Sequence, residues 1–209
     1  MKLSRYFQAL LFAALTLTGL SANAGLILTL QDSGGASASI ADDDGDGFVM
    51  FNGALGTWLV NVSTGITNPL IGTANIDAID LNSVNVSGGT GTLTVTLTRT
   101  GLDRSPAPFV ASVGGTTQGL VSFATLLNGS VISSYSSSAS AFSNIDSGGI
   151  NVAGPYDLSL VATINHSTGL LISSFDYLVT VPEPAMVSLL GAGLVLVGFV
   201  GRRRTRKQA

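Results

Sequence analysis

The middle of the chain alternates apolar and polar residues with a period of two. Residues 92–98 read Thr-Leu-Thr-Val-Thr-Leu-Thr without a break, and Trp58, Val60 and Val62 share one face of another segment. Successive side chains of a strand point to opposite faces, so each segment predicts a strand with one buried face. No helical period persists for three turns before Met186. The pattern predicts an all-β fold, an antiparallel β-sandwich of the jelly-roll or Ig-like kind.

Glycine-rich and serine-rich segments predict where the strands are joined. Residues 87–91 should connect the strand ending at Val86 to the threonine-rich strand, and residues 165–169 should form a hairpin between the last two strands. Ile79 and Leu81 lie in one phase of the alternation, whereas Val84 lies in the other. This change of phase predicts a β-bulge or a corner near residues 82–83.

Residues 128–149 are rich in serine and allow two interpretations. Their composition is that of a flexible linker, but apolar residues such as Val131, Ile132 and Phe142 are typical of a weak edge strand beside a mobile loop. The second interpretation is preferred.

The N-terminus has the features of a secretory signal. Lys2 and Arg5 precede an apolar stretch at residues 9–20, and Ala22-Asn23-Ala24 forms an A-x-A cleavage site. Residues 1–24 are therefore predicted to be a signal peptide, and residues 25–178 the exported β-sandwich domain.

The C-terminus, residues 179–209, predicts a membrane anchor. Residues 185–201 carry no charge, and about 17 residues at about 1.5 Å each give about 26 Å of helix, close to the bilayer core. Arg202, Arg203 and Arg204 begin a basic tail at 202–209. The positive-inside rule places this tail in the cytoplasm and the chain before Pro182 across the inner membrane.

Val181-Pro182-Glu183-Pro184-Ala185 precedes that helix. Its prolines disfavour helical geometry, so residues 181–185 should form an exposed, extended strip just outside the bilayer. The motif, the apolar helix and the arginine cluster together resemble the PEP-CTERM sorting signal. Segments such as residues 52–56 and 80–86 also resemble uncharacterised exported proteins of this class.

The resemblance implies processing by an exosortase-type enzyme of Gram-negative bacteria. It also implies a mature protein at the cell surface or in the extracellular matrix, associated with exopolysaccharide or biofilm. The implied partners are the exosortase, the inner membrane as a transient anchor, and exopolysaccharide.

Charge narrows the range of partners. The whole chain has a formal charge of −3, but between residues 25 and 181 two arginines face eleven aspartates, a charge of −9. An acidic domain disfavours nucleic acid, which needs basic surface, and is compatible with divalent cations or neutral glycans. The chain contains no cysteine, so its stability must come from burial alone.

An aspartate-rich segment at residues 42–47 offers a candidate calcium site. Asp42, Asp44 and Asp46 occupy positions 1, 3 and 5 of a calcium loop, with Gly47 at position 6. Position 12 is Gly53 rather than an acidic residue, so Asp32 or a backbone carbonyl would have to complete the shell. A solvated acidic turn is the other interpretation, and the preferred one.

Catalytic residues are scarce, and no enzymatic activity is predicted. The single histidine, His166, falls in a predicted turn, and Asp77 and Asp80 fall on opposite faces of a strand. Trp58 and the threonine row admit sugar-binding or ice-binding interpretations, but a core tryptophan and an ordinary solvated face are preferred. The leading hypothesis is a structural or adhesive surface protein; the alternative is a secreted glycan-binding module or glycoside hydrolase.

Overall fold

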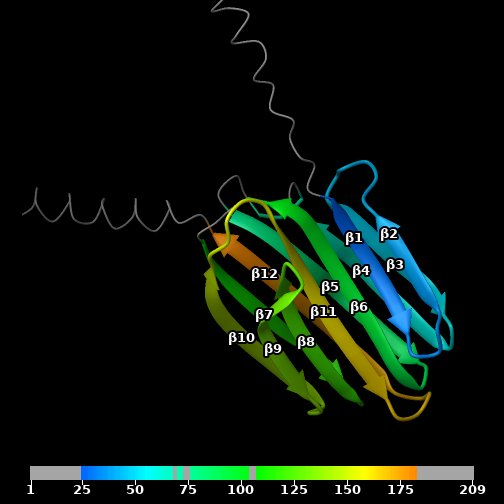
Figure 1. Cartoon of the computed structure of the whole chain (residues 1–209). Helices are drawn as coiled ribbons and strands as arrows, with labels where there is room; N and C mark the ends of the chain where they lie inside the picture. Colours follow the sequence, from blue (N-terminus) through cyan, green and yellow to red (C-terminus); the bar gives the residue numbers. More distant parts are fainter. Residues whose placement is uncertain (1–24, 68–69, 73–75, 104–106, 183–209) are drawn as a thin grey trace, which may run out of the picture.

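The computed structural model describes residues 25–67, 70–72, 76–103 and 107–182, and all its regular elements there are β-strands (Figure 1). They form two six-stranded antiparallel sheets. Sheet I has the order β2-β1-β6-β11-β8-β9, with β1 (Leu26–Asp32), β2 (Ser37–Ala41), β6 (Gly91–Leu102), β8 (Leu120–Leu127), β9 (Ser130–Ser137) and β11 (Tyr156–His166). Sheet II has the order β10-β7-β12-β5-β4-β3, with β3 (Phe48–Leu55), β4 (Trp58–Thr67), β5 (Ile76–Gly88), β7 (Ala107–Thr117), β10 (Ala141–Ile150) and β12 (Ile172–Pro182). The predicted antiparallel sandwich is confirmed.

The connections from β5 to β12 give the sandwich a jelly-roll topology. Each of these connections crosses to the other sheet, except the β8–β9 turn, so four strands of the series lie in each sheet. The β1–β2 and β3–β4 hairpins widen the sheets beyond β6 and β5. Residues 87–91 connect β5 to β6 as predicted. The hairpin predicted at residues 165–169 is wrong, because β11 and β12 belong to different sheets, and turn composition does not reveal which sheet the next strand joins.

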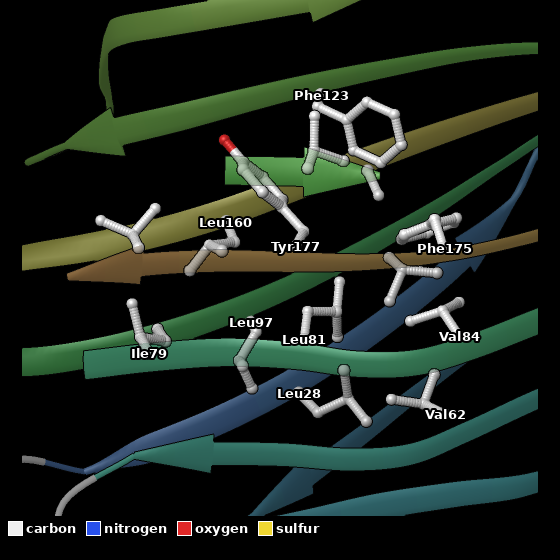
Figure 2. Packing of buried hydrophobic residues seen from close by; sticks show 14 of the residues in the cluster. Leu28, Val62, Ile79, Leu81, Val84, Leu97, Phe123, Leu160, Phe175 and Tyr177 are labelled. Carbon is white, nitrogen blue, oxygen red and sulfur yellow. The ribbon is translucent and has the colours of Figure 1, made fainter. Parts of the chain in front are cut away.

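The inward faces of both sheets build one apolar core (Figure 2). Leu93, Val95 and Leu97 of β6 are fully buried, as their alternation predicted, and Trp58 is a core residue with 1% of its surface exposed. Phe123 of sheet I packs against two rings of β12, with ring centroids 4.9 Å from Phe175 and 5.5 Å from Tyr177. Edge-to-face aromatic contacts of this kind add to the stabilisation from area burial.

The predicted bulge in β5 is confirmed. Phe175 pairs with Val84 and Tyr177 with Leu81, so Asn82 and Ser83 lie opposite Asp176 alone. Ser83 has a φ of 49°, a left-handed conformation that is uncommon for residues with a side chain. Its backbone N–H donates to Oδ1 of Asp176 at 2.5 Å, which stabilises the bulge.

The serine-rich segment forms two edge strands rather than a linker. β9 is the last strand of sheet I and β10 the first strand of sheet II. Tyr135 and Phe142 face each other across the two sheets with ring centroids 6.3 Å apart. The predicted edge strand is therefore confirmed, but the part of the segment expected to be a mobile loop forms a second edge strand.

β1 begins and β12 ends at the same end of the sandwich, here called the terminal end; the opposite end is called the far end (Figure 1). β12 runs to Pro182 and so passes residue 178, the predicted domain boundary. The signal peptide with Ala22 and Ala24, the helix at 185–201 and Arg202, Arg203 and Arg204 lie outside the described residues. Within the described ranges there is no helix long and apolar enough to cross a membrane.

Candidate functional site

The aspartate loop lies at the terminal end, between β2 and β3. One carboxylate oxygen from each of Asp42, Asp44 and Asp46 lies within 4.8 Å of the others. Asp42 accepts backbone N–H groups from Gly45 at 2.9 Å and from Gly47 at 2.8 Å, which folds the loop around its side chain. Because both glycines have positive φ angles, 72° and 80°, side chains at these positions would strain the turn. The geometry therefore brings together the three aspartates that the spacing singled out.

Asp32 lies at the opposite end of the β1–β2 hairpin and does not complete the loop. Its Oδ1 accepts the N–H of Ala36 at 2.7 Å, and its backbone shapes the β1–β2 turn. β2 separates this turn from Asp42. The suggestion that Asp32 completes a calcium shell is therefore wrong. Asp32 is close to the aspartate loop in sequence, but the length of β2 separates them in space.

The sorting motif begins inside the sandwich. Val181 pairs with Asp77 of β5 and Pro182 with Ile76, and only 1% of the surface of Val181 is exposed. Extended geometry is confirmed for these two residues, but the exposed strip is wrong for Val181. The sequence contained a pattern that could have predicted the burial of Val181, because Tyr177, Val179 and Val181 continue the period-two buried face of β12. Glu183, Pro184 and Ala185 lie outside the described residues.

His166 is a buried strand residue at the far end of the sandwich, and its predicted place in a turn is wrong. It is the last residue of β11 and has no exposed surface. Its Nδ1 lies 3.1 Å from the carbonyl oxygen of Gly88 and its Nε2 lies 3.0 Å from Oγ of Ser173. The ring also packs on Trp58 with centroids 4.9 Å apart.

With a neutral imidazole, these contacts fix the direction of each hydrogen bond in the group. A carbonyl oxygen only accepts, so Nδ1 of His166 carries the proton and Nε2 accepts from the Ser173 hydroxyl. Thr117 then donates to Ser173 across 2.7 Å and accepts the N–H of Gly119 at 3.0 Å. Ser173 and His166 have the spacing of a nucleophile and its base, but both side chains are fully buried. The pair therefore joins the two sheets and offers no surface to a substrate.

Removing the Ser173 hydroxyl should destabilise the sandwich. In Ser173→Ala, His166 and Thr117 each lose a buried partner, which should lower the free energy of unfolding by about 1–3 kcal/mol. Urea denaturation measures the change. Ser174→Ala, one residue along β12 on the outward face, is the control, and an equal loss in both variants would contradict the role of the network.

The outward face of sheet II carries an acidic groove of about 770 Å³. Asp80 and Asn82 of β5 line it together with Asp176 of β12, and Gly114 of β7, opposite Asp176, leaves it open. Asp77 lies on the inward face, so the prediction that Asp77 and Asp80 face opposite ways is confirmed. The sequence did not reveal Asp176 as a neighbour of Asp80, because only the register of β12 against β5 brings them together.

Asp80 is held in a setting that disfavours its charge. Its Oδ2 accepts from Nδ2 of Asn82 at 3.2 Å, whereas its Oδ1 is buried without a hydrogen-bond partner in the described part of the chain. Burial raises the pKa of Asp80 above its ordinary value; the hydrogen bond from Asn82 lowers it, and the negative charge of Asp176 raises it further.

Neutralising Asp80 should therefore stabilise the domain at neutral pH. The pKa of Asp80 is higher in the folded protein than in the unfolded chain, so Asp80 ionises first in the unfolded chain as the pH increases. The free energy of unfolding therefore falls as the pH rises from the unfolded pKa through the folded pKa. Asp80→Asn should melt at a higher temperature than the natural protein at pH 7, and the difference should vanish as the pH falls below 3.8, the ordinary aspartate value. Thermal melts across this range test it, with the exposed Asp43→Asn as charge control; a constant difference at all pH values would contradict it.

Part of the outward face of sheet I, here called the hydroxyl face, is built from uncharged side chains. Two rows cross all six strands from β2 to β9. One row is Ser39, Thr29, Thr96, Val161, Ala124 and Ser134, and the other is Ser37, Gln31, Thr94, Thr163, Ser122 and Ser136. Some hydroxyls pair across strands, as Thr98 and Ser159 do at 2.9 Å. The threonine row of β6 is thus repeated on neighbouring strands, which the sequence alone did not show.

Solved structures with weak similarity to the chain include sugar-binding and adhesin domains. The PA14 sugar-binding domain from an RTX adhesin is 10% identical, with 74% of this chain and 89% of that chain covered and a TM-score of 0.36. The K1 cleaved adhesin domain of Lys-gingipain from Porphyromonas gingivalis W83 is 12% identical, with coverage of 65% and 98% and a TM-score of 0.34. The CBM36-1 domain of a xylanase from the hindgut metagenome of Trinervitermes trinervoides is 14% identical, with coverage of 59% and 94% and a TM-score of 0.32. Similarities this low carry no inference about a ligand.

No curated protein sequence matches the chain. The profile of the PEP-CTERM protein-sorting motif matches residues 180–204, which begin at Thr180 in β12 and include the V-P-E-P-A segment. A motif of this kind implies an exported protein whose precursor is anchored in the membrane. The chain therefore carries a PEP-CTERM protein-sorting motif.

Proposed function

We propose that this protein is a non-enzymatic surface or matrix component that binds neutral exopolysaccharide through the hydroxyl face. In this proposal the precursor is held in the inner membrane with its C-terminus in the cytoplasm. An exosortase-type enzyme then processes it at the PEP-CTERM motif, and the mature sandwich reaches the cell surface or the matrix.

The observation that carries the proposal is the absence of charge from the two rows of the hydroxyl face. The domain has eleven aspartates between residues 25 and 181, yet neither row includes one. Threonine and serine hydroxyls donate and accept, as sugar hydroxyls do, whereas an anionic chain would find no cation on these rows. A shallow groove of about 400 Å³ runs over β2, β1 and β6 and is lined by Thr29, Thr94 and Thr96.

Loss of two hydroxyls should weaken this binding. Thr94→Val with Thr96→Val keeps the shape and strand propensity of β6 but removes two hydrogen-bonding groups, each worth about 1 kcal/mol, so affinity should fall about tenfold or more. Affinity electrophoresis of residues 25–182 in gels containing the bacterium's own neutral polysaccharide measures the change.

Thr116→Val, on the outward face of sheet II, is the matched control and should bind like the natural domain. Equal retardation of the natural domain and the double variant would contradict the proposal. Release of reducing sugar during incubation would instead favour a glycoside hydrolase, for which Asp80 and Asp176 in the acidic groove are the available carboxylates.

We also propose that the aspartate loop binds calcium. Its support is the convergence of Asp42, Asp44 and Asp46 on one point, since oxygen ligands from alternate residues suit this ion. Calcium would also relieve the repulsion among the carboxylates, which lie within 4.8 Å of one another.

Calcium should therefore raise the melting temperature of the domain. A ligand present at about 100 times its Kd stabilises the folded state by about 2.7 kcal/mol. Asp44→Asn combined with Asp46→Asn should abolish the shift, whereas Asp43→Asn, in the same loop but outside the cluster, should retain most of it. An unchanged melting temperature and no heat of binding at millimolar calcium would rule out the site.

A further inference from the structure

The last two residues of β12 are held differently from the rest of the strand. Thr180 lies between two partners, Ala78 of β5 and Val110 of β7. The pairing with β7 ends there, so Val181 and Pro182 pair with β5 alone. Proline has no backbone N–H, which removes one donor from the end of this ladder. The strand end therefore depends on a single neighbour.

The end of β12 is also stabilised by the burial of the Val181 side chain. Val181 is 1% exposed and shares a narrow interior space with Leu102 of β6 and Leu158 of β11. Its side chain thus anchors the first residue of the V-P-E-P-A segment in the core, at the terminal end of the sandwich. Opening this end needs Val181 to leave the core and the chain to turn away from β5 at Thr180, whereas β12 before Thr180 stays paired.

A processing enzyme has to contact the motif as an extended peptide. Enzymes and peptide-binding domains that recognise extended segments use the backbone hydrogen-bonding groups and alternate side chains of the peptide. At Val181 the side chain is in the core, and the backbone lies in the ladder with β5. The same residue cannot serve both the sandwich and the cleft of an enzyme at one time.

We infer that the end of β12 is a gate: residues 181 and 182 must detach from β5 before the processing enzyme can bind the sorting motif. This inference rests on the processing step of the proposed function. The fraction of molecules with an open strand end then scales the apparent affinity of the enzyme for its substrate. Folding of the exported domain thereby regulates its own release from the membrane anchor.

The test follows processing of the full-length precursor by pulse-chase in the producing bacterium, which supplies its own enzyme. Leu102→Ala removes packing from under Val181 without changing the motif, and should accelerate processing about tenfold. Leu55→Ala is the matched control, because this leucine is equally buried, 5% exposed, but lies at the far end of the sandwich. It should leave the rate of processing nearly unchanged.

An engineered disulfide tests the gate in the opposite direction. Ala78→Cys with Thr180→Cys places two cysteines directly opposite each other in a chain that has none, next to Val181. The locked precursor should accumulate unprocessed in the oxidising periplasm, and a reductant should restore processing; each single variant should be processed normally.

The outcomes separate the gate from the sorting itself. Processing of the locked precursor at the natural rate would overturn the gate and leave the sorting function intact. Equal acceleration by Leu55→Ala and Leu102→Ala would also overturn it, because global loosening would then be sufficient. A natural precursor that keeps its arginine-rich C-terminus in the matrix fraction would overturn the sorting function and the gate together.

Discussion

Burial of one face of β12 is the constraint on which both the fold and the start of the sorting motif depend. The strand lies inside sheet II between β7 and β5, and Phe175, Tyr177, Val179 and Val181 all point into the core. Phe123 of sheet I packs on the first two of these rings, so β12 also joins the sheets (Figure 2). Because Val181 belongs to this face, the sandwich is complete only when the start of the sorting motif is folded into it.

Hydrogen bonds inside the sandwich supply ties between the sheets that a chain without cysteine cannot make covalently. At the far end, His166 of sheet I is hydrogen-bonded to Ser173 and Gly88 of sheet II. Nearer the middle of the sandwich, the hydroxyl oxygens of Tyr177 and Thr125 are hydrogen-bonded at 2.6 Å across the same interface. Such buried polar contacts are costly unless each partner is satisfied, so they specify how the sheets are placed against each other more than they add net stability.

The sequence predicted features that depend on neighbours along the chain. Strict alternation identified β6 and its buried leucines, and a change of phase located the bulge at Asn82 and Ser83. The sequence did not predict features that depend on the register between strands. Thr96 pairs with Thr29 of β1 and with Val161 of β11, and Asp80 of β5 lines one groove with Asp176 of β12. These residues are too far apart in the sequence for a local pattern to reveal that they are neighbours. His166 was misplaced because Ser167, Thr168 and Gly169 dominate the local turn signal.

The positions of the surfaces would allow the proposed processing and the proposed glycan binding to proceed independently. The motif begins at the terminal end, whereas the two rows of the hydroxyl face cross the strands of sheet I on the side of the sandwich. β12 belongs to sheet II, so detaching Val181 from β5 changes no pairing of Thr94 or Thr96. A precursor still held by its C-terminal anchor would present the same hydroxyl face as the mature protein. In the proposed function, contact with polysaccharide would therefore not have to await cleavage, and cleavage would release a domain that is already bound to the matrix.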